Sequence, residues 1–312
     1  MNRTPAILII VVVSLIGGGA ASNVAALSQH RRNPAINNNA PSYSIPHPVS
    51  FRDVSGRGLL VQTWVNGIGP FNFAIDTGAG ATILSLRVAD EAHVSRTNDR
   101  NTSIAGLSGA RVSARHASIE TLAIGDSENY LPAKGEALIS NGLPADLDGL
   151  LDPTEAFSPL GYEIDLPRHE LAGFDPRADP VQTNSSPVDG AVVSWVREGH
   201  GRRPFVMLDN GDHALLDTGS NFGLAVRDSS ALARTAAHSV RDVGGGRIST
   251  RRSQTNISIG SLNLQRIPVD FVTGAEADAP VLLGLTALRP FRLRFDPLHH
   301  LIEIAPAVNR RW

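Results

Sequence analysis

The tripeptide Asp-Thr-Gly occurs twice in this chain, each time at the end of an apolar run. The first copy is Asp76-Thr77-Gly78 and the second is Asp217-Thr218-Gly219. The composition alone predicts roughly 0.1 copies of this tripeptide, so two copies in matching contexts indicate a repeated unit. The copies lie 141 residues apart. That period is too long for a solenoid and fits two tandem lobes.

Two carboxylates from a repeated unit can form an acid/base pair. Carboxylates held about 3 Å apart cannot both ionise easily, so they share one proton. The ionised partner can then take a proton from a water molecule while the protonated partner polarises a carbonyl group. Asp76 and Asp217 are therefore the candidate catalytic residues.

The residues that follow each Asp support it in different ways. Gly78 and Gly219 allow a tight loop whose backbone amides can reach the carboxylates. The next position is Ala79 in the first copy and Ser220 in the second. A hydroxyl that donates to Asp217 would favour its charged form. We therefore expect Asp217 to be the more acidic member of the pair and Asp76 to hold the proton.

The pattern from residue 51 onward is that of an all-β protein. Short apolar, β-branched runs alternate with turns rich in Gly, Asn and Asp, and a helix is expected only at 88–92. The expected strands are 59–65, 71–75, 82–85, 112–119, 122–124, 136–139, 162–166, the stretch around 170–171, 192–196, 205–208, 213–217, 224–226, 291–295 and 301–304. Two elements recur: 256–260 resembles 121–125, and 281–284 resembles 148–151.

The N-terminus has the layout of a secretory signal peptide. Arg3 precedes an apolar run from Ala6 to Ile16, and small residues suited to cleavage follow at 17–22. The alternative is an uncleaved membrane anchor, for which the run is short. We therefore expect an exported protein, periplasmic or secreted. Residues 1–22 are assigned to the signal peptide, 23–50 to a spacer or propeptide, 51–173 to a first lobe, 174–190 to a linker and 191–312 to a second lobe.

Composition narrows the partners. The net charge of −2 does not favour binding to nucleic acid. Contact with a membrane is expected only if the N-terminal segment stays uncleaved. The chain has no Cys, and its ten His residues show no ligand spacing, so we expect no metal and no cofactor. No Ser lies in a Gly-x-Ser-x-Gly elbow, which disfavours a serine hydrolase.

Together these features resemble the aspartic protease superfamily over roughly residues 52–306. The lobes are short and their flap segments are Gly-rich, so the closer resemblance is to retropepsin-like lobes, here duplicated in one chain as in many bacterial exported proteins. The resemblance implies two pseudo-symmetric β-barrel lobes with a cleft between them. It also implies that the hydroxyls of Thr77 and Thr218 cross the lobe interface, and that a peptide is bound extended and hydrolysed between Asp76 and Asp217.

One position departs from the family pattern. The second lobe has Leu282-Leu283-Gly284, but the first has Leu150-Leu151-Asp152, with Asp in place of the usual Gly. A side chain there needs space that Gly does not. Either the first lobe adjusts locally, or Asp152 points to solvent, or it forms a third carboxylate near the pair.

Two Gly-rich segments are candidate flaps over the cleft. The first contains Gly106, Leu107, Ser108 and Gly109, and the second contains Gly244, Gly245 and Gly246. Flaps of this kind exclude water from a bound peptide. The alternative is that both are plain hairpin turns.

The leading interpretation is a monomeric aspartic endopeptidase. One alternative is a non-catalytic peptide-binding protein that keeps the bilobal fold, for which the Asp152 departure is the only support. Another is that each lobe pairs with a lobe of a second chain. Since both halves of the site are present in one chain, dimerisation is not needed to complete it.

Overall fold

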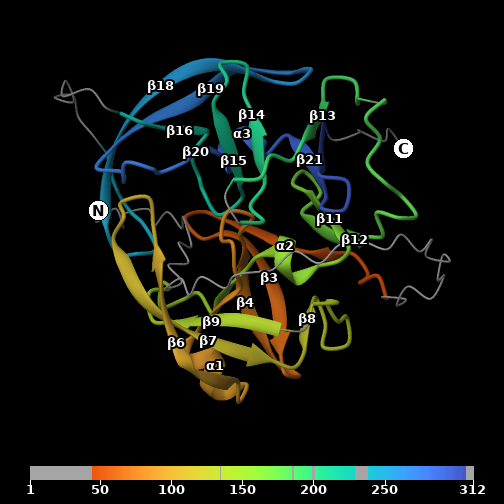
Figure 1. Ribbon diagram of the computed structural model, residues 1–312, viewed down its shortest axis with the longest axis vertical. Coiled ribbons are helices and arrows are strands. Elements are labelled where there is room, and N and C mark those ends of the chain that lie inside the picture. The colour runs from red at the N-terminus through yellow and green to blue at the C-terminus, as the bar shows by residue number, and fades with distance from the viewer. Residues whose placement is uncertain (1–43, 134, 185, 199–200, 229–237, 307–312) are drawn as a thin grey trace, which may run out of the picture.

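The computed structural model describes residues 44–133, 135–184, 186–198, 201–228 and 238–306. In this part of the chain strands predominate and form three sheets, which confirms the all-β prediction (Figure 1). The helices described are short: α1 (Leu86–Glu91), α2 (Pro153–Ala156) and α3 (Leu285–Leu288). None of them has the length and apolar character needed to span a membrane. The expected helix at 88–92 is α1, which begins two residues earlier because the Ser85 side chain accepts a hydrogen bond from the Val88 amide.

The first half of the chain forms a nine-stranded sheet, in the lower part of Figure 1. Its strands, in sheet order, are β2 (Arg52–Val54), β3 (Gly58–Val65), β4 (Ile68–Ile75), β10 (Gly149–Leu151), β5 (Ile83–Ser85), β9 (Gly135–Ser140), β7 (Arg111–Ile119) and β6 (Ser95–Ala105), and β8 (Leu122–Ile124) pairs with β3.

The second half forms a seven-stranded sheet, in the upper part of Figure 1. Its strands, in sheet order, are β14 (Phe205–Met207), β15 (His213–Asp217), β20 (Val281–Gly284), β16 (Leu224–Arg227), β19 (Leu262–Thr273), β18 (Arg247–Ile259) and β17 (His238–Arg241).

A six-stranded sheet joins the two halves. Its order is β1 (Val49–Ser50), β12 (Glu170–Phe174), β11 (Gly161–Asp165), β21 (Phe291–Asp296), β22 (Leu301–Pro306) and β13 (Ala191–Ser194). Its central pair joins β11, from the middle of the chain, to β21, near the end, and there the Tyr162 ring stacks on Phe295 with centroids 4.6 Å apart. The largest apolar cluster includes residues of this sheet and of both halves, so one continuous core lies beneath the two Asp-Thr-Gly loops.

The strand pairing around the two Asp-Thr-Gly motifs follows the same sequence in both halves. β4 pairs in parallel with β10, β10 pairs antiparallel with β5, and β5 pairs in parallel with β9. β15, β20, β16 and β19 repeat this series of parallel, antiparallel and parallel pairs. The similar segments 148–151 and 281–284 thus place β10 and β20 beside the strand that carries each Asp.

The N-terminal boundary differs from the sequence prediction. Val49 and Ser50 were assigned to the spacer, but they form β1 and pair with Leu171 and Glu170 of β12. Val49 is buried, and this explains why so short a strand is held. The proposed signal peptide at 1–22 and the spacer up to residue 43 lie outside the described residues. So does residue 185 of the expected linker.

Candidate active site

Each candidate Asp lies at the carboxyl end of a strand, next to the parallel strand that supports it. Asp76 follows β4, and its amide donates to the Leu151 carbonyl of β10 at 2.9 Å. Asp217 ends β15 and is paired with Gly284 of β20. The strand periodicity buries the preceding Ile75 and Leu216 in the common core. The two aspartates therefore stand on the opposite side of their strands from that core.

The two carboxyls are packed against each other and against the opposite loop. The amides of Gly78 and Gly219 donate to Oδ1 of Asp76 and Asp217, each at 2.9 Å. A Cβ on Gly78 would lie 2.8 Å from the carboxyl carbon of Asp217, and a Cβ on Gly219 would overlap the carboxyl of Asp76. Each glycine is thus required by the neighbouring carboxyl, because any side chain would push the pair apart. Both aspartates are 0 % exposed.

The two threonines lock the loops together across the interface. Thr77 Oγ1 donates to the Leu216 carbonyl at 2.6 Å and accepts from the Thr218 amide at 3.0 Å. Thr218 Oγ1 donates to the Ile75 carbonyl at 2.9 Å and accepts from the Thr77 amide at 3.1 Å. Four buried hydrogen bonds therefore hold the carboxyls face to face, as the resemblance implied.

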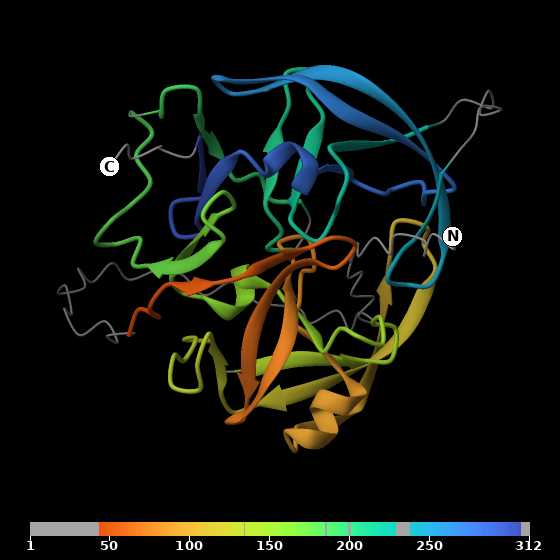
Figure 2. The same ribbon diagram turned by 180° about the vertical axis from the view of Figure 1, so that it is seen from behind.

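The two Gly-rich segments also meet. The turn between β6 and β7 carries Gly106, Leu107, Ser108 and Gly109, and the turn between β17 and β18 carries Gly244, Gly245 and Gly246. The Ser108 amide donates to Asp242 Oδ2 at 2.8 Å, which joins the first turn to the second. Figure 2 shows the hairpin arms β6–β7 and β17–β18 reaching toward each other from the two halves.

One segment of the chain matches a known protein family. Residues 61–135 match the family model of the gag-polyprotein putative aspartyl protease. The matched segment contains the first Asp-Thr-Gly loop and the first Gly-rich turn. Over this segment the chain is similar to the aspartic protease superfamily. No match is found among curated proteins.

The electrostatics of the pair Asp76 and Asp217 are asymmetric. Burial raises the pKa of both carboxyls, and the negative charge of Asp217 raises the pKa of Asp76 further. The rise at Asp217 is limited by its hydrogen bonds from Asp76 and the Gly219 amide and by the positive charge of Arg203. The pKa of Asp76 is therefore raised more than that of Asp217, which favours protonated Asp76 and ionised Asp217.

The sequence analysis also expected Asp217 to be the more acidic of the two, on the basis of the Ser220 hydroxyl, but the physical cause in the structure is different. The Ser220 hydroxyl accepts from the Phe222 amide at 3.3 Å, so its hydrogen bond belongs to its own turn. The Ser220 backbone amide, and not its side chain, lowers the pKa of Asp217. Sequence reasoning also missed Arg203, whose charge favours ionised Asp217.

Arg203 is placed by strand pairing. It precedes β14, and the neighbouring Pro204 carbonyl accepts from the Leu216 amide at 2.9 Å, which brings residue 203 level with Asp217. Its guanidinium lies over the Phe205 ring, and Nη1 is buried without a hydrogen-bond partner among the described residues. The sequence signal that could have identified Arg203 is a cationic residue just before β14, the strand that pairs with the Asp217 strand β15.

Asp152 is buried, so the expectation that it might point to solvent is wrong. It is the N-cap of α2, where its Oδ1 accepts from the Thr154 amide at 2.9 Å. Burial raises the pKa of Asp152 to about 7, with a further contribution from Glu155. The charge of Asp152 also raises the pKa of Asp76. Asp152 is thus a third carboxyl whose charge acts on the pair. At the equivalent position of the second half, α3 begins after Gly284, which has no side chain to cap the helix.

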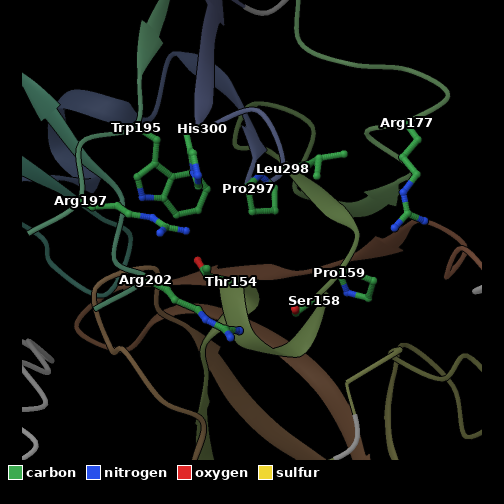
Figure 3. Close-up of a pocket in the computed structure, with 10 residues that line it drawn as sticks. All are labelled: Thr154, Ser158, Pro159, Arg177, Trp195, Arg197, Arg202, Pro297, Leu298 and His300. Carbon is green, nitrogen blue, oxygen red and sulfur yellow. The ribbon is translucent and has the colours of Figure 1, made fainter. Parts of the chain in front are cut away.

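A separate hollow lies between α2 and the turn that joins β21 to β22 (Figure 3). It encloses about 230 Å³, and Trp195 and His300 lie side by side on one wall. The cationic side chains on its lining are Arg177, Arg197 and Arg202. Neither aspartate of the pair lines this hollow.

Proposed function

We propose that the chain is an aspartic endopeptidase that hydrolyses peptide bonds with a water molecule activated between Asp76 and Asp217. The observation that carries the proposal is the apposition of two fully buried carboxyls. The family match supports aspartic protease chemistry in general. The four hydrogen bonds of the threonines support it further, because they fix the two carboxyls in one geometry before substrate binds.

The proposed reaction needs only the two side chains and water. Ionised Asp217 takes a proton from the water molecule as the water oxygen attacks the peptide carbonyl carbon. Protonated Asp76 donates to the carbonyl oxygen and stabilises the charge that develops there. The proton gained by Asp217 then passes to the amide nitrogen, the C–N bond breaks, and Asp76 recovers its proton from the tetrahedral intermediate. The products are a carboxylic acid and an amine.

The test is cleavage of a mixed peptide library from pH 3 to 8. Wild type should cleave peptides. Asp76→Asn and Asp217→Asn should each remain folded but lose activity by at least about a thousandfold, because an Asn side chain can neither donate the catalytic proton nor accept it. Asp126→Asn is the control: it changes a carboxylate that accepts from the backbone amides of its own surface turn, and it should keep activity. A statine-containing peptide, which mimics the transition state, should inhibit wild type.

The alternative function is peptide binding without hydrolysis. It predicts that wild type and Asp217→Asn bind peptides equally and cleave none, and that a statine peptide binds no more tightly than a plain one. Cleavage retained by purified Asp76→Asn would refute the proposed pair.

We also propose that the protein is an exported monomer. One chain supplies both aspartates and both Gly-rich turns, so a second copy adds nothing that the site lacks. Light scattering checks the monomer, and a dimer mass would contradict it. Cell fractionation with N-terminal sequencing of the mature protein checks the export and cleavage of the leader.

A further inference from the structure

Asp242 joins the two Gly-rich turns. Its side chain accepts from the Gly246 amide of its own turn at 2.9 Å and from the Ser108 amide of the other turn at 2.8 Å. Asp242 is only 4 % exposed. A buried carboxylate that accepts two backbone amides makes strong, charge-assisted hydrogen bonds. One side chain therefore ties together two hairpins that belong to opposite halves of the molecule.

The turns fit together too closely for any residue but glycine at two positions. A Cβ on Gly106 would overlap the carboxyl of Asp242, and a Cβ on Gly244 would overlap the Ala110 carbonyl. Neither glycine has a positive φ, so contact with the other turn, and not turn geometry, is what requires them. The two turns are shaped to interlock.

Each turn also inserts one aliphatic side chain into the opposite half. Leu107 of the first half is 3 % exposed and packs in an apolar cluster of the second half, with Phe205, Leu215, Phe222 and Leu282. Val243 of the second half is 4 % exposed and packs in a cluster of the first half, with Leu60, Ala74, Ile83 and Leu150. The exchange is reciprocal.

Both clusters lie on the same side of the sheets as the aspartates. Leu215 is two residues before Asp217, and Ala74 is two residues before Asp76, so each side chain points to the same face as the Asp that follows it. Leu282 pairs with Leu215 and Leu150 pairs with Ala74, which extends each cluster beside the catalytic pair. An extended peptide over the pair would point its side chains at these two clusters.

We propose that Leu107 and Val243 occupy the two apolar subsites that flank the scissile bond, and that Asp242 is the latch that holds them there. The resting site is thus closed by the chain's own side chains, and a peptide enters when the Ser108–Asp242 hydrogen bond opens. The proposal rests on the proposed function and deepens it by naming how the site is regulated: a peptide reaches the aspartates only after Leu107 and Val243 have withdrawn. Asp242 is a positioning residue that does not touch the reacting atoms.

Hydrogen exchange measures the latch without any activity. The Glu276 amide donates to the Leu107 carbonyl at 2.9 Å, so it exchanges only when the first turn withdraws. Asp242→Ala should speed exchange at Glu276 by at least about tenfold, the effect of losing one charge-assisted hydrogen bond. Asp126→Ala is the matched control, because Asp126 also accepts from two backbone amides but only within its own turn. Unchanged exchange at Glu276 in Asp242→Ala would overturn the latch.

A cross-link tests whether the turns must part. The chain has no Cys, and a Cβ on Gly246 would lie 2.7 Å from the Cβ of Ala110 and 1.8 Å from the Ser108 hydroxyl. Ala110→Cys with Gly246→Cys, made together with Ser108→Ala to remove that hydroxyl, therefore places two thiols together after a shift of about 1 Å. The oxidised protein should turn over peptides at least about a hundredfold more slowly than the same protein after reduction, while Ala110→Cys alone is indifferent to reductant. Equal turnover in both forms contradicts the proposal. Failure of the thiols to join, checked by mass spectrometry, contradicts the closed arrangement.

Peptide preference tests the subsites. Peptides with Leu, Ile or Val on both sides of the cleaved bond should have kcat/KM at least about tenfold above matched peptides with Ser, Asp or Lys there. Equal kcat/KM would remove the subsite assignment. The two proposals fail differently. Cleavage with no change in the latch variants leaves the proposed function and removes this inference. Absence of cleavage by every variant, with accelerated exchange in Asp242→Ala, leaves the latch and removes the function.

Discussion

At the scale of single residues, the site depends on charges that the paired motifs do not contain. Arg203 lies level with Asp217 and limits the rise of its pKa, whereas Asp152 raises the pKa of Asp76. One cation and one buried carboxyl thus bias a symmetric-looking pair toward protonated Asp76. These two side chains can be changed without touching either Asp-Thr-Gly motif.

Arg203→Gln should shift the acidic limb of the pH–kcat/KM profile to higher pH. The positive charge favours ionised Asp217, so its removal raises the pKa of that carboxyl, and a higher pH is needed to ionise it. Arg203→Lys, which keeps the charge, should restore the limb, and Arg202→Gln is a control at the neighbouring position. A limb that moves equally in Gln and Lys variants would indicate a packing effect in place of a charge effect.

Asp152→Asn should flatten the dependence of stability on pH. Burial raises the folded-state pKa of Asp152 to about 7 from 3.8, so the folded protein binds a proton that the unfolded chain releases between about pH 4 and pH 7. The free energy of unfolding therefore falls as pH rises through this window, by up to a few kcal/mol. Asn keeps the N-cap but cannot ionise. Denaturant unfolding of both proteins from pH 4 to 8 checks this, and parallel curves would contradict it, since Glu155 titrates in both.

At the scale of elements, the β4 and β15 loops are held by side chains, whereas the long hairpins are held at their tips. Strands β6 and β19 and most of β18 were not among the strands expected from the sequence, because no single apolar period runs through them. The middle of β18 is exposed, and the apolar alternation of β19 changes phase between Leu264 and Ile267. Their order comes from pairing with each other and from the contact between the two turns.

Thr77→Val should destabilise the protein by about 1–3 kcal/mol. The change removes the hydroxyl that donates to Leu216 and accepts from the Thr218 amide, and it leaves both backbone groups buried without a partner. Thr77→Ser keeps the hydroxyl and is the control. Denaturant unfolding gives the difference, and equal stability of the Val and Ser variants would show that the lock contributes nothing.

At the scale of the whole molecule, the two halves are not independent. The six-stranded sheet pairs β11 of the first half with β21 near the end of the chain, and β1 joins the same sheet. Tyr162 and Phe295 stack across that pairing in the common core. The dyad, the threonine lock and the interlocked turns each need both halves as well.

Residues 44–190 expressed alone should therefore fail to fold cooperatively. The fragment retains β11 and β12 but loses β21, and it exposes the apolar residues that face the second half. Denaturant unfolding followed by circular dichroism checks this. A sharp two-state transition like that of the full chain would contradict it, and mixing with the complementary fragment should restore the transition.

The sequence by itself determined the local features: the all-β class, the two Asp-bearing strands and the Gly-rich turns. These depend on residue periodicity and on loop chemistry that neighbouring residues supply. Only the tertiary structure decided which distant groups meet. Asp242 reaches Ser108 across 134 residues of chain, Arg203 lies beside Asp217 through strand pairing, and Asp152 is buried as a helix cap. The reason is physical: burial and charge act through space, and no local pattern records which segments pack together.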